Sequence, residues 1–156
     1  ERWFLGNTYH MAIGQGDVLV TPLQINLLIG MIGNGGKLCK PEIVKSEKLK
    51  MQSCEDLGIS QKTLELIKEG MILACSSGGT AFPFFDFRPQ VACKTGTAQH
   101  GGEETLPHAW FTALAPADKP EVAITVLLEA AGEGSYEAAP VAKEILSYWF
   151  HERQGP

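Results

Sequence analysis

Three strand-like runs follow one another in the second half of the chain, and together they predict an antiparallel sheet. They span residues 88–99, 109–115 and 122–129 and are rich in valine, threonine, phenylalanine and small residues, as strands usually are. The second and third runs flank the sequence Pro-Ala-Asp-Lys-Pro at 116–120, whose length and composition are typical of a hairpin turn. We therefore expect these two strands to be antiparallel neighbours.

A strong helix signal lies in the first half of the chain. Thr21, Pro22 and Gln24 have the form of a capping box with proline at the first helical position. The residues that follow are apolar on nearly every face until a pair of glycines at 35–36 ends the pattern. Because such a helix has no polar side to present to solvent, we expect it to be central and buried on more than one side.

Two further helices are expected, at residues 60–75 and from residue 140 to about 152. The apolar positions expected to face the core are Leu64, Ile67, Met71 and Leu73 in the former, and Val141, Ile145, Leu146 and Trp149 in the latter. Helices on either side of a run of antiparallel strands predict an α+β fold, an antiparallel sheet flanked by helices.

Composition excludes several classes of function. With 156 residues, 44% of them apolar, the chain is sufficient for one globular domain. Its net charge is -5 and its thirteen lysines and arginines are scattered, so we expect no nucleic-acid partner. The histidines are dispersed, and the sequence Gly-Gln-Gly at 14–16 lacks the third glycine of a dinucleotide loop. We expect neither a metal nor a cofactor, and no membrane-spanning stretch is present.

The four cysteines are Cys39, Cys54, Cys75 and Cys93. No two of them form a C-x-x-C pair, which argues against zinc. An even number permits two disulfides in three connectivities. Single cysteines within apolar runs are more often buried thiols, and we expect thiols here.

A lysine interrupts the first of the strand-like runs, in the sequence Lys94-Thr95-Gly96-Thr97. Side chains alternate along a strand, so Lys94 and Gly96 share one face while the two threonines share the other. A glycine lets the backbone of a ligand approach the strand, and an ammonium group beside two hydroxyls suits a peptide that ends in a carboxylate. The simpler interpretation is an edge-strand lysine that opposes aggregation, with threonines chosen for strand propensity.

Several segments, in order along the chain, carry a resemblance to a known family. They are AIGQGDVLVTPLQINLLIGMIGNGGKLCKPEIV, GGTA, ACKTGTAQ, HAWFTALAP, PEVAITVLLE and AAPVAKEIL. Together they resemble the class B penicillin-binding proteins, the serine D,D-transpeptidases that crosslink peptidoglycan and carry a K-T-G motif. The resemblance extends over most of residues 3–149 and implies part of the penicillin-binding and β-lactamase-like transpeptidase fold. A β-lactamase matches these segments less well.

The resemblance implies a role for each residue of the K-T-G strand. Lys94 would be catalytic and keep the active-site cleft electropositive. Thr95, Gly96 and Thr97 would bind substrate, with the two threonines holding the carboxylate of a terminal D-alanine or of a β-lactam. The backbone N–H of Thr97 would also be catalytic, as one of two donors to the oxyanion of the tetrahedral intermediate.

The sequence departs from the family in one respect. Neither S-x-x-K nor S-x-N occurs at any of the serines, which are Ser46, Ser53, Ser60, Ser76, Ser77, Ser135 and Ser147. In the family both motifs precede the K-T-G strand. We therefore expect residues 1–156 to be the C-terminal portion of a transpeptidase domain, a single incomplete domain that lacks its nucleophile and is inactive alone.

The implied partners are the missing N-terminal part of the same domain, a peptidoglycan stem peptide ending in D-Ala-D-Ala, and β-lactams. The implied location is the outer face of the bacterial cytoplasmic membrane, with an anchor outside this chain. The sequence KTGTAQ leans toward the enzymes of elongation and cell shape. The alternative is a non-enzymatic module whose K-T-G edge binds a peptide or a cell-wall partner without turnover.

Overall fold

The central element is a three-stranded antiparallel sheet of order β3-β4-β5. The computed structural model describes residues 2–16, 18–43, 53–102 and 104–153. Its three central strands are β3 (Ala92–Ala98), β4 (His108–Ala115) and β5 (Val122–Leu128). The expected hairpin at 116–120 is confirmed, because β4 and β5 pair antiparallel from Ala109 opposite Leu128 to Ala115 opposite Val122. The first strand begins later than residue 88, in agreement with Pro89, which has no N–H to donate to a ladder.

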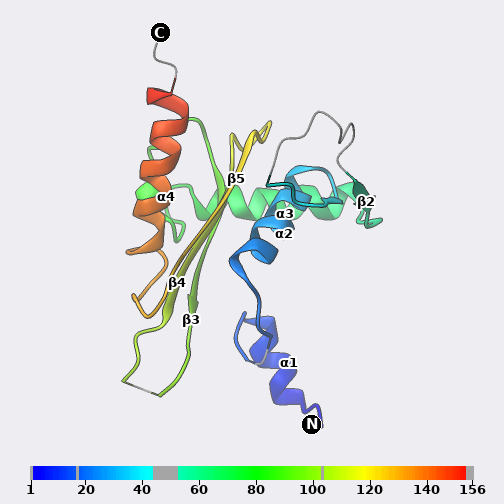
Figure 1. Cartoon of the computed structure of the whole chain (residues 1–156), viewed down its shortest axis with the longest axis vertical. Helices are drawn as coiled ribbons and strands as arrows, with labels where there is room; N and C mark the ends of the chain where they lie inside the picture. Colours follow the sequence, from blue (N-terminus) through cyan, green and yellow to red (C-terminus); the bar gives the residue numbers. More distant parts are fainter. Residues whose placement is uncertain (1, 17, 44–52, 103, 154–156) are drawn as a thin grey trace.

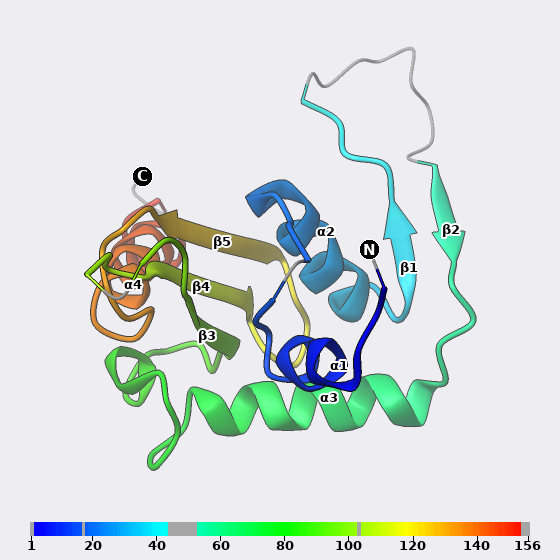
Figure 2. The same cartoon turned by 90° about the horizontal axis from the view of Figure 1, so that it is seen from below.

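Helices cover both faces of this sheet, which confirms the α+β architecture. Figures 1 and 2 show α4 on one face and α2 on the other, with α3 beside β3. The α-helices are α1 (Leu5–Ala12), α2 (Pro22–Gly33), α3 (Gln61–Ala74) and α4 (Ala138–Ser147). A short 3₁₀ helix lies at Phe82–Phe84 and a π-helical turn at Tyr148–Glu152. A second, two-stranded sheet of β1 (Lys37–Cys39) and β2 (Cys54–Asp56) was not expected from the sequence.

The helix starts follow their capping signals. Thr21 Oγ1 accepts a hydrogen bond from Gln24 N at 3.2 Å, and Gln24 Oε1 accepts one from Thr21 N at 2.8 Å. This reciprocal pair is the predicted capping box. At the start of α3, Ser60 Oγ accepts a hydrogen bond from Thr63 N at 3.1 Å. Both helices therefore begin where the sequence predicted.

The burial predicted for α2 is only partly found. Ile29 and Met31 are buried, but Leu28 remains 48% exposed and Leu23 55% exposed. The helix packs against the sheet along one side, and within the described residues nothing covers the other side to the same extent. The expectation of a helix buried on several sides is therefore wrong for this chain.

The core consists of two layers, one on each face of the sheet. Cys93 joins the layer under α4, whereas the neighbouring Ala92 joins the layer under α2 and α3. The buried helix residues in these layers are Ile29 of α2, Met71 of α3, and Ala138, Ala139, Ala142 and Leu146 of α4. Adjacent residues of β3 thus serve opposite layers, as the alternation of a strand requires.

The core-facing sides of α3 and α4 differ from those predicted. Leu146 is fully buried as expected, but Val141, Ile145 and Trp149 are 38–49% exposed, and alanines face the sheet instead. Small alanine side chains allow the helix axis to lie close to the strands, and the larger residues are turned outward. In α3, Ile67 and Leu73 are likewise exposed, while Leu64 and Met71 are buried.

The cysteines form two disulfides, so the expectation of free thiols is wrong. Cys39–Cys54 joins the paired residues of β1 and β2, and Cys75–Cys93 joins the end of α3 to β3. The Cα atoms of the second pair are 5.8 Å apart, within the usual range. Cys93 lies on the face of β3 that meets the end of α3, a proximity that spacing along the sequence does not reveal.

The Cys75–Cys93 disulfide is expected to contribute to stability. Replacing both residues with alanine should lower the free energy of unfolding by about 2 to 3 kcal/mol, because the closed loop no longer restricts the unfolded chain. Urea denaturation of the intact protein measures this loss. The same stability in the double variant and in the wild type would contradict the prediction.

Candidate active site

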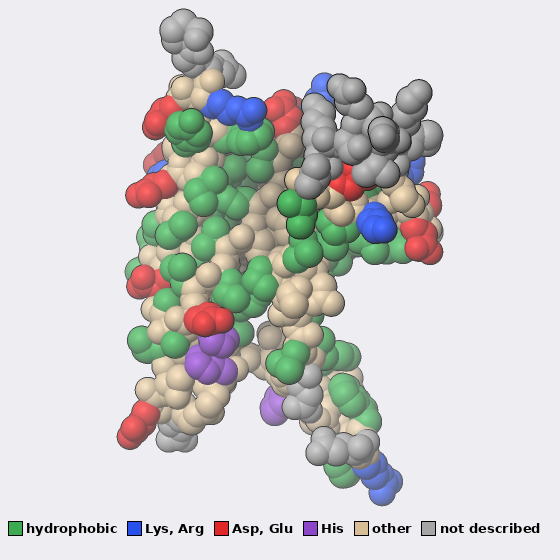
Figure 3. Space-filling view, viewed as in Figure 1, with side chains coloured by type: hydrophobic (Ala, Val, Ile, Leu, Met, Phe, Trp, Pro, Cys, Tyr) green, Lys and Arg blue, Asp and Glu red, His purple; other side chains and the backbone are tan. Residues whose placement is uncertain are grey.

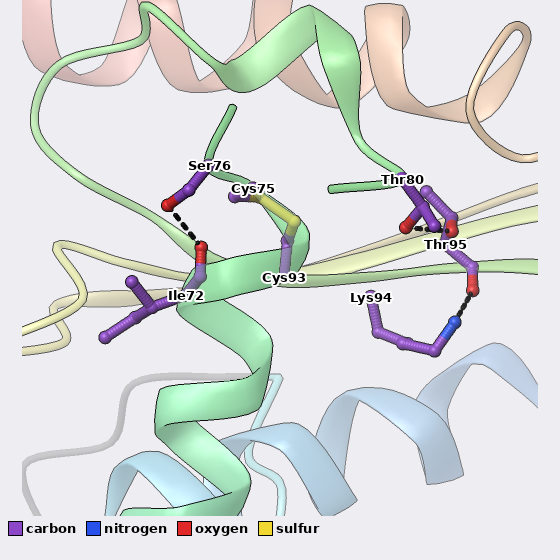
Figure 4. Close-up of a disulfide and its surroundings, with 7 residues drawn as sticks. All are labelled: Ile72, Cys75, Ser76, Thr80, Cys93, Lys94 and Thr95. Carbon is purple, nitrogen blue, oxygen red and sulfur yellow. Dashed lines mark hydrogen bonds between the residues drawn. A yellow bond between two sulfur atoms is a disulfide. The ribbon is translucent and has the colours of Figure 1, made fainter. Parts of the chain in front are cut away.

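The predicted site residues lie together on β3, one of the two edge strands of the central sheet. Figure 4 shows Lys94 pointing toward the side of α2 and Thr95 pointing to the opposite side. Cys93, which precedes them, is tied by its disulfide to the end of α3. The disulfide thus fixes β3 to the end of α3 at the residue immediately before Lys94. Within the described residues no strand pairs with the outer side of β3.

Lys94 is exposed and borders an apolar hollow of about 430 Å³. The hollow is lined by Ile29, Ile32, Ile67, Gly70 and Met71 in addition to the lysine. Lys94 Nζ donates a hydrogen bond to the carbonyl oxygen of Thr95 at 2.5 Å. No carboxylate in the described part of the chain forms an ion pair with it. Its positive charge is therefore available to an anionic ligand at this edge.

The side chain of Thr95 forms a hydrogen bond with the loop that follows α3. Its Oγ1 donates a hydrogen bond to Thr80 Oγ1 at 3.0 Å, as Figure 4 shows. The loop requires Gly79 next to Thr80, because a Cβ at this position would overlap the carbonyl oxygens of Leu73 and Ala74. The hydroxyl of Thr95 thus has a fixed neighbour that is itself positioned by the end of the helix.

The second half of the motif is in contact with the loop between β5 and α4. Gly134 N donates to Thr97 Oγ1 at 3.5 Å, the long limit of a hydrogen bond. A Cβ on Gly134 would overlap the carbonyl oxygens of both Trp110 and Gly96. Gly96 itself lies opposite Trp110, and a Cβ there would come within 3.1 Å of the Trp110 Cβ. Two glycines therefore permit the close packing of loop and strand at this point.

Gln15, in the segment between α1 and α2, bonds to the open edge of β3. Its Nε2 donates to the carbonyl oxygen of Thr97 at 3.0 Å, and its Oε1 accepts from Gln99 N at 3.3 Å. The sequence Gly-Gln-Gly at 14–16 does not fit the glycine pattern of a dinucleotide-binding loop, and no other role was predicted for Gln15. Its contact with β3 is one that the sequence analysis missed.

The structure thus brings Lys94, Thr95, Gly96 and Thr97 together on one edge and adds three residues that were not predicted. The residues that were missed are Gln15, Thr80 and Gly134. Thr80 belongs to the segment GGTA, so that segment was a usable signal. Chemically, this edge offers a cation, hydroxyls and backbone hydrogen-bonding groups, which suits an extended ligand with a carboxylate.

The histidines provide a second, smaller grouping. His100 and His108, at the two ends of the β3–β4 connection, stack with ring centroids 3.7 Å apart. His108 Nδ1 accepts a hydrogen bond from Ala130 N at 3.0 Å. Among the described residues no three histidine, cysteine or acidic side chains cluster as metal ligands would. In the same ranges no helix combines the length and the apolar composition needed to cross a membrane.

Comparison with known proteins gives a consistent result. Residues 1–147 match the family model of the penicillin-binding protein transpeptidase domain. The chain is 33% identical to the peptidoglycan D,D-transpeptidase MrdA of Haemophilus influenzae, over 97% of this chain and 27% of that protein.

Solved structures agree with this match. The penicillin-binding protein PBP2 of Helicobacter pylori superposes with a TM-score of 0.80 at 36% identity, covering 96% of this chain and 28% of the other. A penicillin G acyl-enzyme complex of penicillin-binding protein A from Mycobacterium tuberculosis superposes with a TM-score of 0.71 at 30% identity. This match covers 90% of the present chain and 34% of the other. The chain therefore spans between a quarter and about a third of the length of these relatives.

Proposed function

The chain belongs to the penicillin-binding protein transpeptidase domain family, and we propose that it forms the lysine side of the active site of a peptidoglycan D,D-transpeptidase. The observation that carries this proposal is the run Lys94 to Thr97 on the open edge of β3, with the charge of Lys94 free of any described carboxylate. An extended peptide adds to such an edge by backbone pairing.

Each residue of the run has a role in this proposal. Lys94 attracts the carboxylate of the substrate, a stem peptide ending in D-Ala-D-Ala, and the hydroxyls of Thr95 and Thr97 orient it. Gly96 lets the peptide approach the strand. The N–H of Thr97 stabilises the negative charge that develops on the carbonyl oxygen under attack. β-Lactams, which imitate the same terminus, occupy the same edge.

The nucleophile comes from a part of the domain that this chain does not contain. The serine oxygen attacks the carbonyl carbon of the penultimate D-alanine, an ester forms, and the terminal D-alanine leaves with the proton on its amine. An amine of a second stem peptide then attacks the ester and releases the serine. The chain has no S-x-x-K and no S-x-N, so it supplies binding and electrostatic stabilisation but not the serine.

The apolar hollow beside Lys94 supports the proposal that the rest of the domain packs against this chain there. It is lined by Ile29, Ile67 and Met71 among others. Figure 3 shows further hydrophobic side chains on the surface, over the sheet and over α1. Covering this surface removes apolar area from water. A segment that packs there lies next to the Lys94 amine, where the serine has to be.

We also propose that the protein works outside the cytoplasm, in the cell wall compartment. Two disulfides within a chain of 156 residues support this location, because disulfides persist mainly in oxidising compartments. The sequence KTGTAQ supports a role in elongation and cell shape.

Labelling with a fluorescent penicillin tests the proposal. We expect no covalent label on the chain of residues 1–156 and one label per molecule on the longer protein that includes its S-x-x-K segment, both read by gel and by intact mass. Folding of each protein is checked by circular dichroism. If the longer protein is folded and unlabelled, the transpeptidase assignment fails and a binding module without turnover replaces it.

A further inference from the structure

The open edge of β3 is already occupied at two places by side chains of the chain itself. Lys94 Nζ bonds to the carbonyl oxygen of Thr95, and Gln15 Nε2 bonds to that of Thr97. In an antiparallel strand the N–H and C=O of one residue point to the same side, so the N–H of Thr97 also faces this edge. These are the groups that an added peptide would use.

The contact of Gln15 imitates one residue of an added strand. Its side-chain amide donates to the carbonyl of Thr97 and accepts from the N–H of Gln99, two residues further along. One residue of a neighbouring parallel strand, through its own N–H and C=O, would bond to the same two groups, a carbonyl and the N–H two residues later. Gln15 therefore fills one position of a strand that is otherwise absent from the described chain.

The backbone on either side of Gln15 passes through glycines, which are free to adopt several conformations. Gly14 and Gly16 flank the residue with φ of +76° and +100°, conformations that glycine adopts without strain. The segment is held to β3 at this point by two hydrogen bonds of 3.0 and 3.3 Å between Gln15 and the strand. Hydrogen bonds of this kind contribute little net stability, so a competing donor can replace them.

We propose that Gln15 is a specificity-determining residue that closes the edge of β3 at Thr97 and withdraws when a ligand amide takes its place. The proposal rests on the proposed function, because it assumes that peptides and β-lactams pair with this edge. A ligand with an amide N–H aimed at the Thr97 carbonyl competes directly with the Gln15 amide. A ligand without that amide has no need of this carbonyl and leaves Gln15 where it is.

The test compares Gln15→Ala with the wild type in the longer protein that contains the nucleophile. Removing the two competing hydrogen bonds is expected to speed acylation by a penicillin with an acylamino side chain about tenfold. Acylation by a penicillin nucleus without that side chain is expected to change less than about twofold. Gln61→Ala, at the exposed start of α3, serves as the control and should leave both rates unchanged.

A second readout does not depend on acylation. Gln15→Ala is expected to increase the hydrogen exchange rate of the Gln99 amide, which loses its acceptor. Unchanged exchange at Gln99, or slower acylation by the acylamino penicillin at the same melting temperature, would overturn the proposal. If the wild type is not acylated at all, the proposed function fails, and the role of Gln15 in specificity fails with it. Faster exchange at Gln99 in Gln15→Ala would in that case still establish the contact between Gln15 and β3.

Discussion

Lys94→Met is expected to slow acylation by a fluorescent penicillin about a hundredfold or more in the protein that contains the nucleophile. Methionine keeps the length and the apolar stem of the lysine, so the contacts with the hollow lined by Ile29 and Met71 remain. The positive charge at the edge of β3 is lost, and with it the attraction for the ligand carboxylate. The measurement is the second-order rate of acylation at constant salt.

Two further variants separate charge from packing. Lys94→Arg keeps the cation and is expected to retain more activity than the methionine variant, though less than the wild type, because the guanidinium has a different shape. Lys62→Met, on the exposed face of α3, removes a lysine from a place outside the site and should have no effect. Equal acylation rates for the wild type and Lys94→Met would mean that Lys94 only protects an edge strand.

Local patterns predicted α2, α3, α4, the three central strands and the turn between β4 and β5, but not α1 or the pair β1–β2. The capping box at Thr21 and the hairpin between β4 and β5 depend on residues close together in the sequence, and both are found where they were expected. The proposed site residues Lys94 to Thr97 are consecutive, so predicting one strand was enough to place them together. Their catalytic and binding roles rest on the family resemblance and are still to be tested.

Contacts between distant segments are what the sequence did not reveal. Gln15 meets Thr97 across 82 residues, and no local pattern reports such a pairing. The same holds for Cys75 and Cys93, which meet because a helix end lies against a strand. On α4 the larger apolar residues were expected to face the core, but close approach to the sheet favours alanines such as Ala142.

The exposed side of α2 has a related explanation. Its sequence is apolar on nearly every face, which predicted burial on several sides, yet Leu23 and Leu28 remain exposed. The chain matches about a quarter of MrdA and of PBP2. If it is part of a longer domain, as we propose, the exposed side of α2 would pack against the rest of that domain.

Gly134→Ala is expected to destabilise the domain by about 4 kcal/mol and to reduce acylation together with stability. The added Cβ would overlap the carbonyl oxygens of Trp110 and Gly96, which belong to β4 and β3. Neither oxygen can move without disturbing paired strands, so the loop between β5 and α4 has to shift instead. That shift withdraws the Gly134 N–H from Thr97 Oγ1.

Gly102→Ala is the matched control, because a Cβ at Gly102 meets nothing within 4 Å. Urea denaturation of both variants measures the loss of stability, and acylation by a fluorescent penicillin below the unfolding transition measures the effect on the site. A Gly134→Ala protein as stable as Gly102→Ala would show that the loop does not pack against β3 and β4. Normal stability with slow acylation would instead show that the loop acts on Thr97 alone, so the two measurements distinguish a structural contact from a positioning one.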